Sequence, residues 1–105
     1  MTKFAFALLA FSVGAAFGAG NAKDGHAVYD RACKNCHGGT GDANPNIAKM
    51  MKVEIPNLGS PSVQNLSDDE LKKIVTDGKG KMPPIRSVTG KSIEDVIAYV
   101  RTFKK

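Results

Sequence analysis

Apolar residues recur along four segments of the chain at spacings of three and four, the periodicity that lines one face of an α-helix. In order along the chain, these sets are Gly25, Val28, Tyr29, Ala32 and Cys33; Ile47, Met50 and Met51; Leu71, Ile74 and Val75; and Ile93, Val96, Ile97, Val100 and Phe103. No run of more than a few residues alternates apolar and polar positions, as a half-buried strand would. The pattern therefore predicts an all-α protein of about four helices, with these sets facing inward.

The first two helices have signals at their N-termini. Asn21 is predicted to cap the first helix, and Asp24 three residues later makes a variant of the capping box. Gly25 inside this helix costs about 1 kcal/mol relative to alanine. It indicates either the close approach of another backbone or fraying near the first turn. For the second helix, Asn44 is the predicted N-cap and Pro45 the first helical residue.

The third helix has the clearest local signal. Ser67 and Glu70 form a capping box in front of its apolar face. Gly78 is predicted to end the helix in the left-handed conformation. Glycine and proline predict loops in three stretches, which are 38–42, 54–61 and 78–84.

The last helix has two competing starts. Val88–Thr89 with Ile93 fits a hydrophobic staple, whereas Ser92 with Asp95 fits a capping pair. The sequence shows no internal repeat and no sign of a second domain.

The N-terminal 20 residues differ in character from the rest. Lys3 precedes an uncharged, apolar stretch of about 14 residues, which continues through small residues to Gly20. This combination predicts a secretory signal peptide over 1–20, cleaved between residues 18 and 22. A retained membrane anchor is the alternative, although a spanning helix needs about 20 apolar residues. The mature domain is then 21–105.

Removing the leader changes the composition of what remains. Four of the five phenylalanines leave with it, so Phe103, Tyr29 and Tyr99 are the only aromatic residues in a domain of about 85 residues. Such a domain has a marginal core of its own. The net charge falls from +5 to +4, because Lys3 is the only charged residue of the leader. Nothing here resembles the clustered basic surface that nucleic-acid binding needs.

Cys33, Cys36 and His37 carry the most specific chemistry in the sequence. Positions i, i+3 and i+4 share one face of a helical turn, so all three side chains can meet the same object. The pattern C-x-x-C-H is the sequence sign of c-type haem attachment. Each thiol adds to a vinyl group of the porphyrin, and the imidazole binds the iron. The motif therefore predicts one covalent haem c.

Two cysteines at this spacing also fit a redox dithiol, a disulfide or half of a zinc site. A zinc site needs further ligands, and His26 is the only histidine besides His37. A dithiol does not require the histidine, and no βαβ pattern surrounds the motif. Export suits both haem attachment and a disulfide, because the compartment outside the bacterial inner membrane is oxidising. A largely buried haem would also supply apolar mass that the domain lacks.

A second axial ligand would decide between electron transfer and ligand binding. Met82 is the first candidate, because it lies in a loop rich in glycine and proline that can present a thioether. Met51 is next, although methionine at helical spacing is more often core filler. Met50 shares that reservation, and His26 lies on the helix that leads into the haem motif and cannot easily reach the far side of the ring.

With these residues in view, the mature region resembles a class I cytochrome c of the small bacterial type. Gly25 and Tyr29 resemble the glycine and aromatic residue of that family's first helix. The run 96–100 resembles the last helix, and Gly80-Lys81-Met82-Pro83 resembles the loop that gives the axial methionine. The chain departs from the family in having no tryptophan.

The resemblance implies a specific arrangement. About four helices would surround one covalently bound haem, with the first and last helices crossing. His37 and Met82 would be the axial ligands. Pro45 resembles the proline whose carbonyl accepts a hydrogen bond from the second nitrogen of the proximal histidine.

These observations favour a monomeric periplasmic electron carrier with no substrate, not an enzyme. Lys79 and Lys81 flank the proposed ligand and are expected to attract an acidic redox partner, although an ordinary solvated surface explains them equally well. Further basic residues nearby in sequence are Lys72, Lys73, Arg86 and Lys91. The rival class is a haem enzyme or gas sensor, which needs an open iron site and a distal acid–base group, and no histidine is left to serve.

Overall fold

The computed structural model describes residues 20–105, so the leader predicted over 1–20 lies outside the described residues except for Gly20. The described part contains α1 (Ala22–Ala32), α2 (Lys34–His37), α3 (Pro45–Met51), α4 (Pro61–Gln64), α5 (Asp68–Asp77) and α6 (Lys91–Arg101). Only α1, α3, α5 and α6 are longer than four residues. Apart from one isolated bridge between Lys79 and Met82, there is no β-structure in residues 20–105. The all-α prediction is confirmed.

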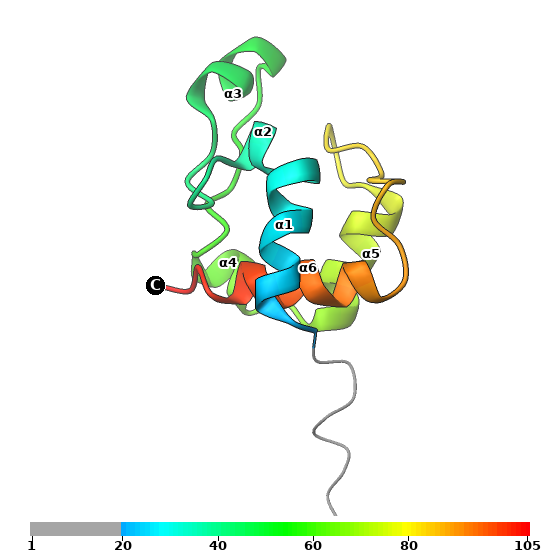
Figure 1. Ribbon diagram of the computed structural model, residues 1–105. Coiled ribbons are helices and arrows are strands. Elements are labelled where there is room, and N and C mark those ends of the chain that lie inside the picture. The colour runs from blue at the N-terminus through cyan, green and yellow to red at the C-terminus, as the bar shows by residue number, and fades with distance from the viewer. Residues whose placement is uncertain (1–19) are drawn as a thin grey trace, which may run out of the picture.

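The first and last long helices cross, as the family resemblance implied. Figure 1 shows α6 running across the N-terminal part of α1. One cluster of buried residues fills this crossing, with Val28 and Tyr29 from α1, Val88 from the preceding loop and Val96 from α6. A second cluster joins the other face of α6 to α4 and α5. The core therefore lies at one end of the molecule, around α6.

Gly25 is the contact point of the two crossing helices. A Cβ atom built on Gly25 would lie 1.9 Å from the carbonyl oxygen of Asp95 and 3.0 Å from Cβ of Tyr99. No side chain fits at that distance, because real Cβ contacts below 3.0 Å essentially do not occur. The helix-interior glycine therefore marks a close backbone approach, the first of the two explanations that the sequence left open.

Most of the predicted N-caps are present. Asn21 accepts a hydrogen bond from the amide of Asp24, at 3.0 Å. Asn44 accepts from the first turn of α3, and Pro45 is the first residue of that helix. Ser67 and Glu70 make both bonds of the capping box at α5.

The other half of the Asn21 cap comes from α6. Asn21 donates its amide hydrogen to Oδ1 of Asp95 at 2.8 Å, and Nζ of Lys91 donates to the same oxygen at 2.8 Å. Asp95 is only 6% exposed. A carboxylate 74 residues away along the chain thus does what was expected of Asp24, because the helix crossing brings α6 against the start of α1.

Several local predictions were wrong in detail. Gly78 has a positive φ of 81° but ψ is 173°, so it is not a left-handed helical cap. Gly90 is the N-cap of α6 in place of Thr89 or Ser92, although Val88 and Ile93 do share one core cluster. α3 buries none of its residues, and Met50 is 71% exposed.

Within residues 20–105 no helix is long and apolar enough to cross a membrane.

Replacing Asp95 by asparagine should destabilise the protein more at neutral pH than in acid. The Asn21 amide, followed by the Lys91 ammonium, holds the pKa of Asp95 below its ordinary value. A lowered folded-state pKa contributes stability above the unfolded pKa of about 3.9 that is lost as pH falls through the folded value. Urea unfolding at several pH values between about 3 and 7 should show the stability gap between wild type and Asp95→Asn closing in acid. A gap independent of pH would contradict this role.

Candidate cofactor site

The cysteine and histidine side chains stand where α1 passes into α2. Cys33 ends α1 as its C-cap and is also the N-cap of α2. Cys36 and His37 lie on the single turn of α2, and all three side chains are half-buried. Both cysteines are free thiols, and burial raises the pKa of Cys33 to about 11. The three predicted residues thus lie at the junction of α1 and α2.

The segment after the motif folds back and binds the end of α2. The amide of Ala43 donates to the carbonyl of His37 at 2.8 Å, and the amide of Asn44 donates to that of Cys36 at 2.9 Å. The Asn44 side chain adds a bond to the carbonyl of Asn35. These bonds satisfy carbonyls that a helix end leaves without partners. The backbone that carries Cys36 and His37 is therefore held from outside its own turn.

Tyr29 connects this turn to the core. Its side chain is fully buried, and its hydroxyl donates to the carbonyl of Gly38, the residue after His37. Its ring packs against Tyr99 and Phe103, with centroid distances of 5.3 Å in both cases. Burial raises the pKa of the Tyr29 hydroxyl, which keeps it a neutral donor. Sequence reasoning matched Tyr29 as a helix aromatic but missed this hydrogen bond.

The environment of His37 suits a metal ligand. Its pKa is lowered by burial, so the ring is neutral and retains a nitrogen lone pair. Nδ1 is buried and has no hydrogen-bond partner in the described residues. Pro45 follows as the exposed first residue of α3 and makes no bond to this nitrogen. Its predicted role toward His37 therefore stays a prediction.

Met82 lies at the end of a tight turn. Lys79 and Met82 exchange two backbone hydrogen bonds, each 2.9 Å long. Gly80, the first central residue, has φ of +58°, and Lys81 does not share this positive φ, which is the pattern of a II′ turn. Gly78 lies under the turn, where a Cβ would meet the Met82 carbonyl at 2.6 Å. The half-buried Met82 thus ends a hydrogen-bonded turn, and its role as an axial ligand stays a prediction.

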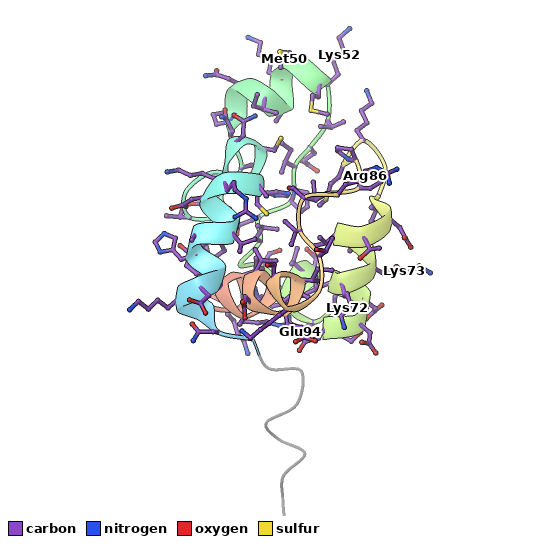
Figure 2. All side chains as sticks on the ribbon, turned by 45° about the vertical axis from the view of Figure 1, so that its right-hand side comes forward. Met50, Lys52, Lys72, Lys73, Arg86 and Glu94 are labelled. Atoms are coloured by element: carbon purple, nitrogen blue, oxygen red, sulfur yellow. The ribbon has the colours of Figure 1, made fainter. Side chains whose placement is uncertain are left out.

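The turn and the cysteine motif occupy the same end of the molecule. Figure 1 shows α2, α3 and the yellow segment that follows α5 together at the end away from α6. Among the other candidates, Met51 is half-buried at the end of α3, whereas Met50 is exposed at its tip (Figure 2). His26 is exposed on α1, 3.3 Å from Asp30, and its ring stacks on Tyr99. Its ring therefore packs on α6.

This end of the molecule has no core of its own. No residue in 30–40, 42–58 or 72–87 is buried. Apolar side chains in these stretches are nevertheless half-buried, and those that pack against neither core cluster include Ile47, Val53, Ile55, Ile74 and Met82. Such surfaces need an apolar partner. A porphyrin is flat, largely apolar and of the size that a missing core requires, so the residues present fit a haem.

No group of three or more His, Cys, Asp or Glu side chains that could hold a metal ion lies within residues 20–105. The donor set at this end is two thiols, one neutral imidazole and one thioether. Thiols with an adjacent histidine match covalent haem attachment, and a histidine with a methionine matches axial ligation of its iron.

Three comparisons with known proteins point the same way. The sequence model of the family described as "Cytochrome C oxidase, cbb3-type, subunit III" matches residues 20–100. Cytochrome c-555 of Methylococcus capsulatus is 31% identical over 81 residues, which are 74% of this chain. The chain spans only 58% of the length of that relative. Among solved structures, the KustC0563 c-type cytochrome superposes with a TM-score of 0.65 at 24% identity, covering 78% of this chain and 99% of its own.

Proposed function

Since the chain belongs to the family described as cytochrome c oxidase, cbb3-type, subunit III, and is a small class I-like c-type cytochrome, we propose that it is a periplasmic one-electron shuttle. Membership of the family supports the assignment as a c-type cytochrome that carries electrons. The periplasmic compartment, the axial ligands and the presence of a single haem go beyond the family, and we propose them here. They are supported by the leader over 1–20, by Met82 and by the single C-x-x-C-H motif.

One observation carries the proposal. The turn with Cys33, Cys36 and His37 lies at the end of the described molecule where Ile47, Val53, Ile55, Ile74 and Met82 are half-buried but belong to neither core cluster. Cys33 and Cys36 would hold one haem c by thioether bonds, and His37 and Met82 would bind its iron. The haem supplies an Fe(III)/Fe(II) couple, and the chain supplies ligands that stay in place through the cycle.

The chain tunes that couple through ligand softness and burial. As a ligand, the thioether of Met82 would favour Fe(II) relative to a second imidazole. Half-buried apolar side chains around the site disfavour the extra ferric charge, because a low dielectric penalises charge. Both effects raise the reduction potential. Hydrogen bonds on the α2 carbonyls and the Lys79–Met82 turn hold both ligand-bearing segments fixed.

The direct test is the mass of the purified protein. We expect protein made in cells competent in cytochrome maturation to carry one haem mass beyond the mature polypeptide, retained after denaturation. A variant with Cys33→Ser and Cys36→Ser should lose all of it, because serine forms no thioether. A wild-type mass equal to the bare chain would end the proposal. The N-terminus read from the same spectrum tests cleavage between residues 18 and 22.

The family description names an oxidase subunit, which is a second candidate setting for the same carrier. In that case the domain would pass electrons within a larger complex. The observation that favours it is the match over residues 20–100. Gel filtration of extracts separates the two, since a shuttle elutes as a small protein and a subunit elutes with the complex.

The surface beside the site suggests the kind of partner. Lys91 and Lys72 are engaged with Asp95 and Glu94, at 2.8 and 3.9 Å. The exposed cations of this side with no ion pair among the described residues include Lys34, Lys49, Lys52, Lys73, Lys79, Lys81 and Arg86. Figure 2 shows Lys52 beside the exposed Met50, with Arg86 and Lys73 along the same edge. We propose that an acidic redox protein docks here.

Ionic strength tests this docking surface. Oxidation of the reduced protein by anionic hexacyanoferrate should slow as salt is added, because screening weakens attraction to the lysines. Lys79→Glu should slow the reaction several-fold at low salt. Lys104→Glu, the same charge change just after α6 at the other end of the molecule, should have little effect. Rates that ignore both salt and Lys79 would remove electrostatic steering.

A further inference from the structure

Lys81 makes a contact that its place in the docking surface does not explain. It is the second central residue of the Lys79–Met82 turn, and its Nζ donates a hydrogen bond to the carbonyl oxygen of Met51 at 3.0 Å. Met51 is the last residue of α3. The bond therefore joins two segments 30 residues apart along the chain.

The C-terminal end of α3 leaves one carbonyl oxygen available to a positively charged donor. Lys52 adopts the left-handed conformation, with φ of 57° and ψ of 46°, and its amide turns back to the carbonyls of Ala48 and Lys49. The amide of Val53 also binds Ala48. The terminal carbonyl of Met51 is thus left for an outside donor. A lysine ammonium is favourable there because the C-terminal end of a helix carries partial negative charge.

This bond links the two segments that flank the cofactor site, which are α3 on one wall and the Lys79–Met82 turn on the other. α3 buries none of its residues, and among the helices its main neighbour is α2. The Met82 turn belongs to the opposite wall, after α5 (Figure 1). Neither wall has a buried residue to fasten it to the other. The single hydrogen bond between Lys81 and Met51 can therefore influence how often α3 and the Met82 turn separate.

We infer that Lys81 is a positioning residue, which fastens the Met82 turn to α3 and so limits opening of the site on the methionine side. This inference rests on the proposed ligation by Met82. The inference gives different roles to two neighbouring lysines of the docking surface. Lys79 is free for a partner, whereas Lys81 holds the site closed.

The experiment compares Lys81→Ala with Lys79→Ala in the haem-loaded protein. Both variants lose one positive charge from the same turn, but only Lys81→Ala loses the bond to α3. A hydrogen bond worth about 1 kcal/mol corresponds to about a fivefold change in opening. We expect imidazole to replace the methionine ligand of the ferric protein about fivefold faster in Lys81→Ala and at the wild-type rate in Lys79→Ala. Lys81→Arg, which keeps a donor, should restore most of the wild-type rate.

Hydrogen exchange supplies a readout that does not depend on ligation. The amide of Met82, which donates to the carbonyl of Lys79, should exchange about fivefold faster in Lys81→Ala only. Equal exchange and imidazole rates in the two alanine variants would overturn the inference. If Met82→Ala binds imidazole at the wild-type rate, Met82 is not the ligand, while the exchange comparison still decides whether Lys81 fastens the turn.

Discussion

Replacing Met82 by alanine is expected to leave a protein that keeps its covalent haem, binds carbon monoxide readily when reduced, and has a lower reduction potential. The substitution removes the soft thioether that favours Fe(II), while Cys33, Cys36 and His37 are untouched. Axial ligands span about 0.8 V of potential, so a fall on the order of 0.1 V is expected. Optical titration and carbon monoxide binding of the reduced protein at neutral pH measure both changes.

Met51→Ala is the matched control. Met51 is also a half-buried methionine at this end of the molecule, and only its backbone carbonyl makes the bond to Lys81. Truncating its side chain should therefore leave carbon monoxide excluded and the potential near the wild-type value. If Met51→Ala opens the site and Met82→Ala does not, Met51 is the ligand. Wild-type protein that takes up carbon monoxide without any substitution favours a gas sensor or haem enzyme over a shuttle.

The sequence predicted those features that depend on residues close together in the chain. The C-x-x-C-H spacing was enough to place Cys33, Cys36 and His37 on one corner, because a helical turn fixes positions three and four apart. The capping box at Ser67 formed for the same reason. Gly25 was informative because a glycine inside a helix has a cost, which the crossing with α6 explains.

The sequence did not predict features that depend on contacts between distant parts of the chain. Asp95 caps α1, and Lys81 reaches Met51, through contacts across 74 and 30 residues. Neither leaves a mark in the local pattern. Met50 was predicted to face inward because its spacing with Ile47 is helical, but spacing only defines a shared face. It does not say whether the protein supplies anything for that face to pack on.

Gly25→Ala is expected to be among the most destabilising single substitutions in the domain. Alanine favours a helix interior by about 1 kcal/mol over glycine, so local propensity alone predicts a gain. The added Cβ would lie 1.9 Å from the Asp95 carbonyl oxygen and 2.5 Å from its carbon, and backbone cannot swing aside as a side chain can. α1 and α6 would have to separate, which would disturb the packing of Tyr29 and Val96. We expect a loss of ~3 kcal/mol or more.

Gly39→Ala is the control for this prediction, because it adds the same methyl group where space exists. The nearest atom to a Cβ at Gly39 is the flexible Cε of Lys34, at 3.7 Å, and this glycine does not need a positive φ. Denaturant unfolding of the haem-loaded proteins should place Gly39→Ala within about 0.5 kcal/mol of wild type. If Gly25→Ala were equally stable, the two helices would not meet as closely as described. The turn that carries Cys33 and His37 would then need another anchor than the α1–α6 crossing.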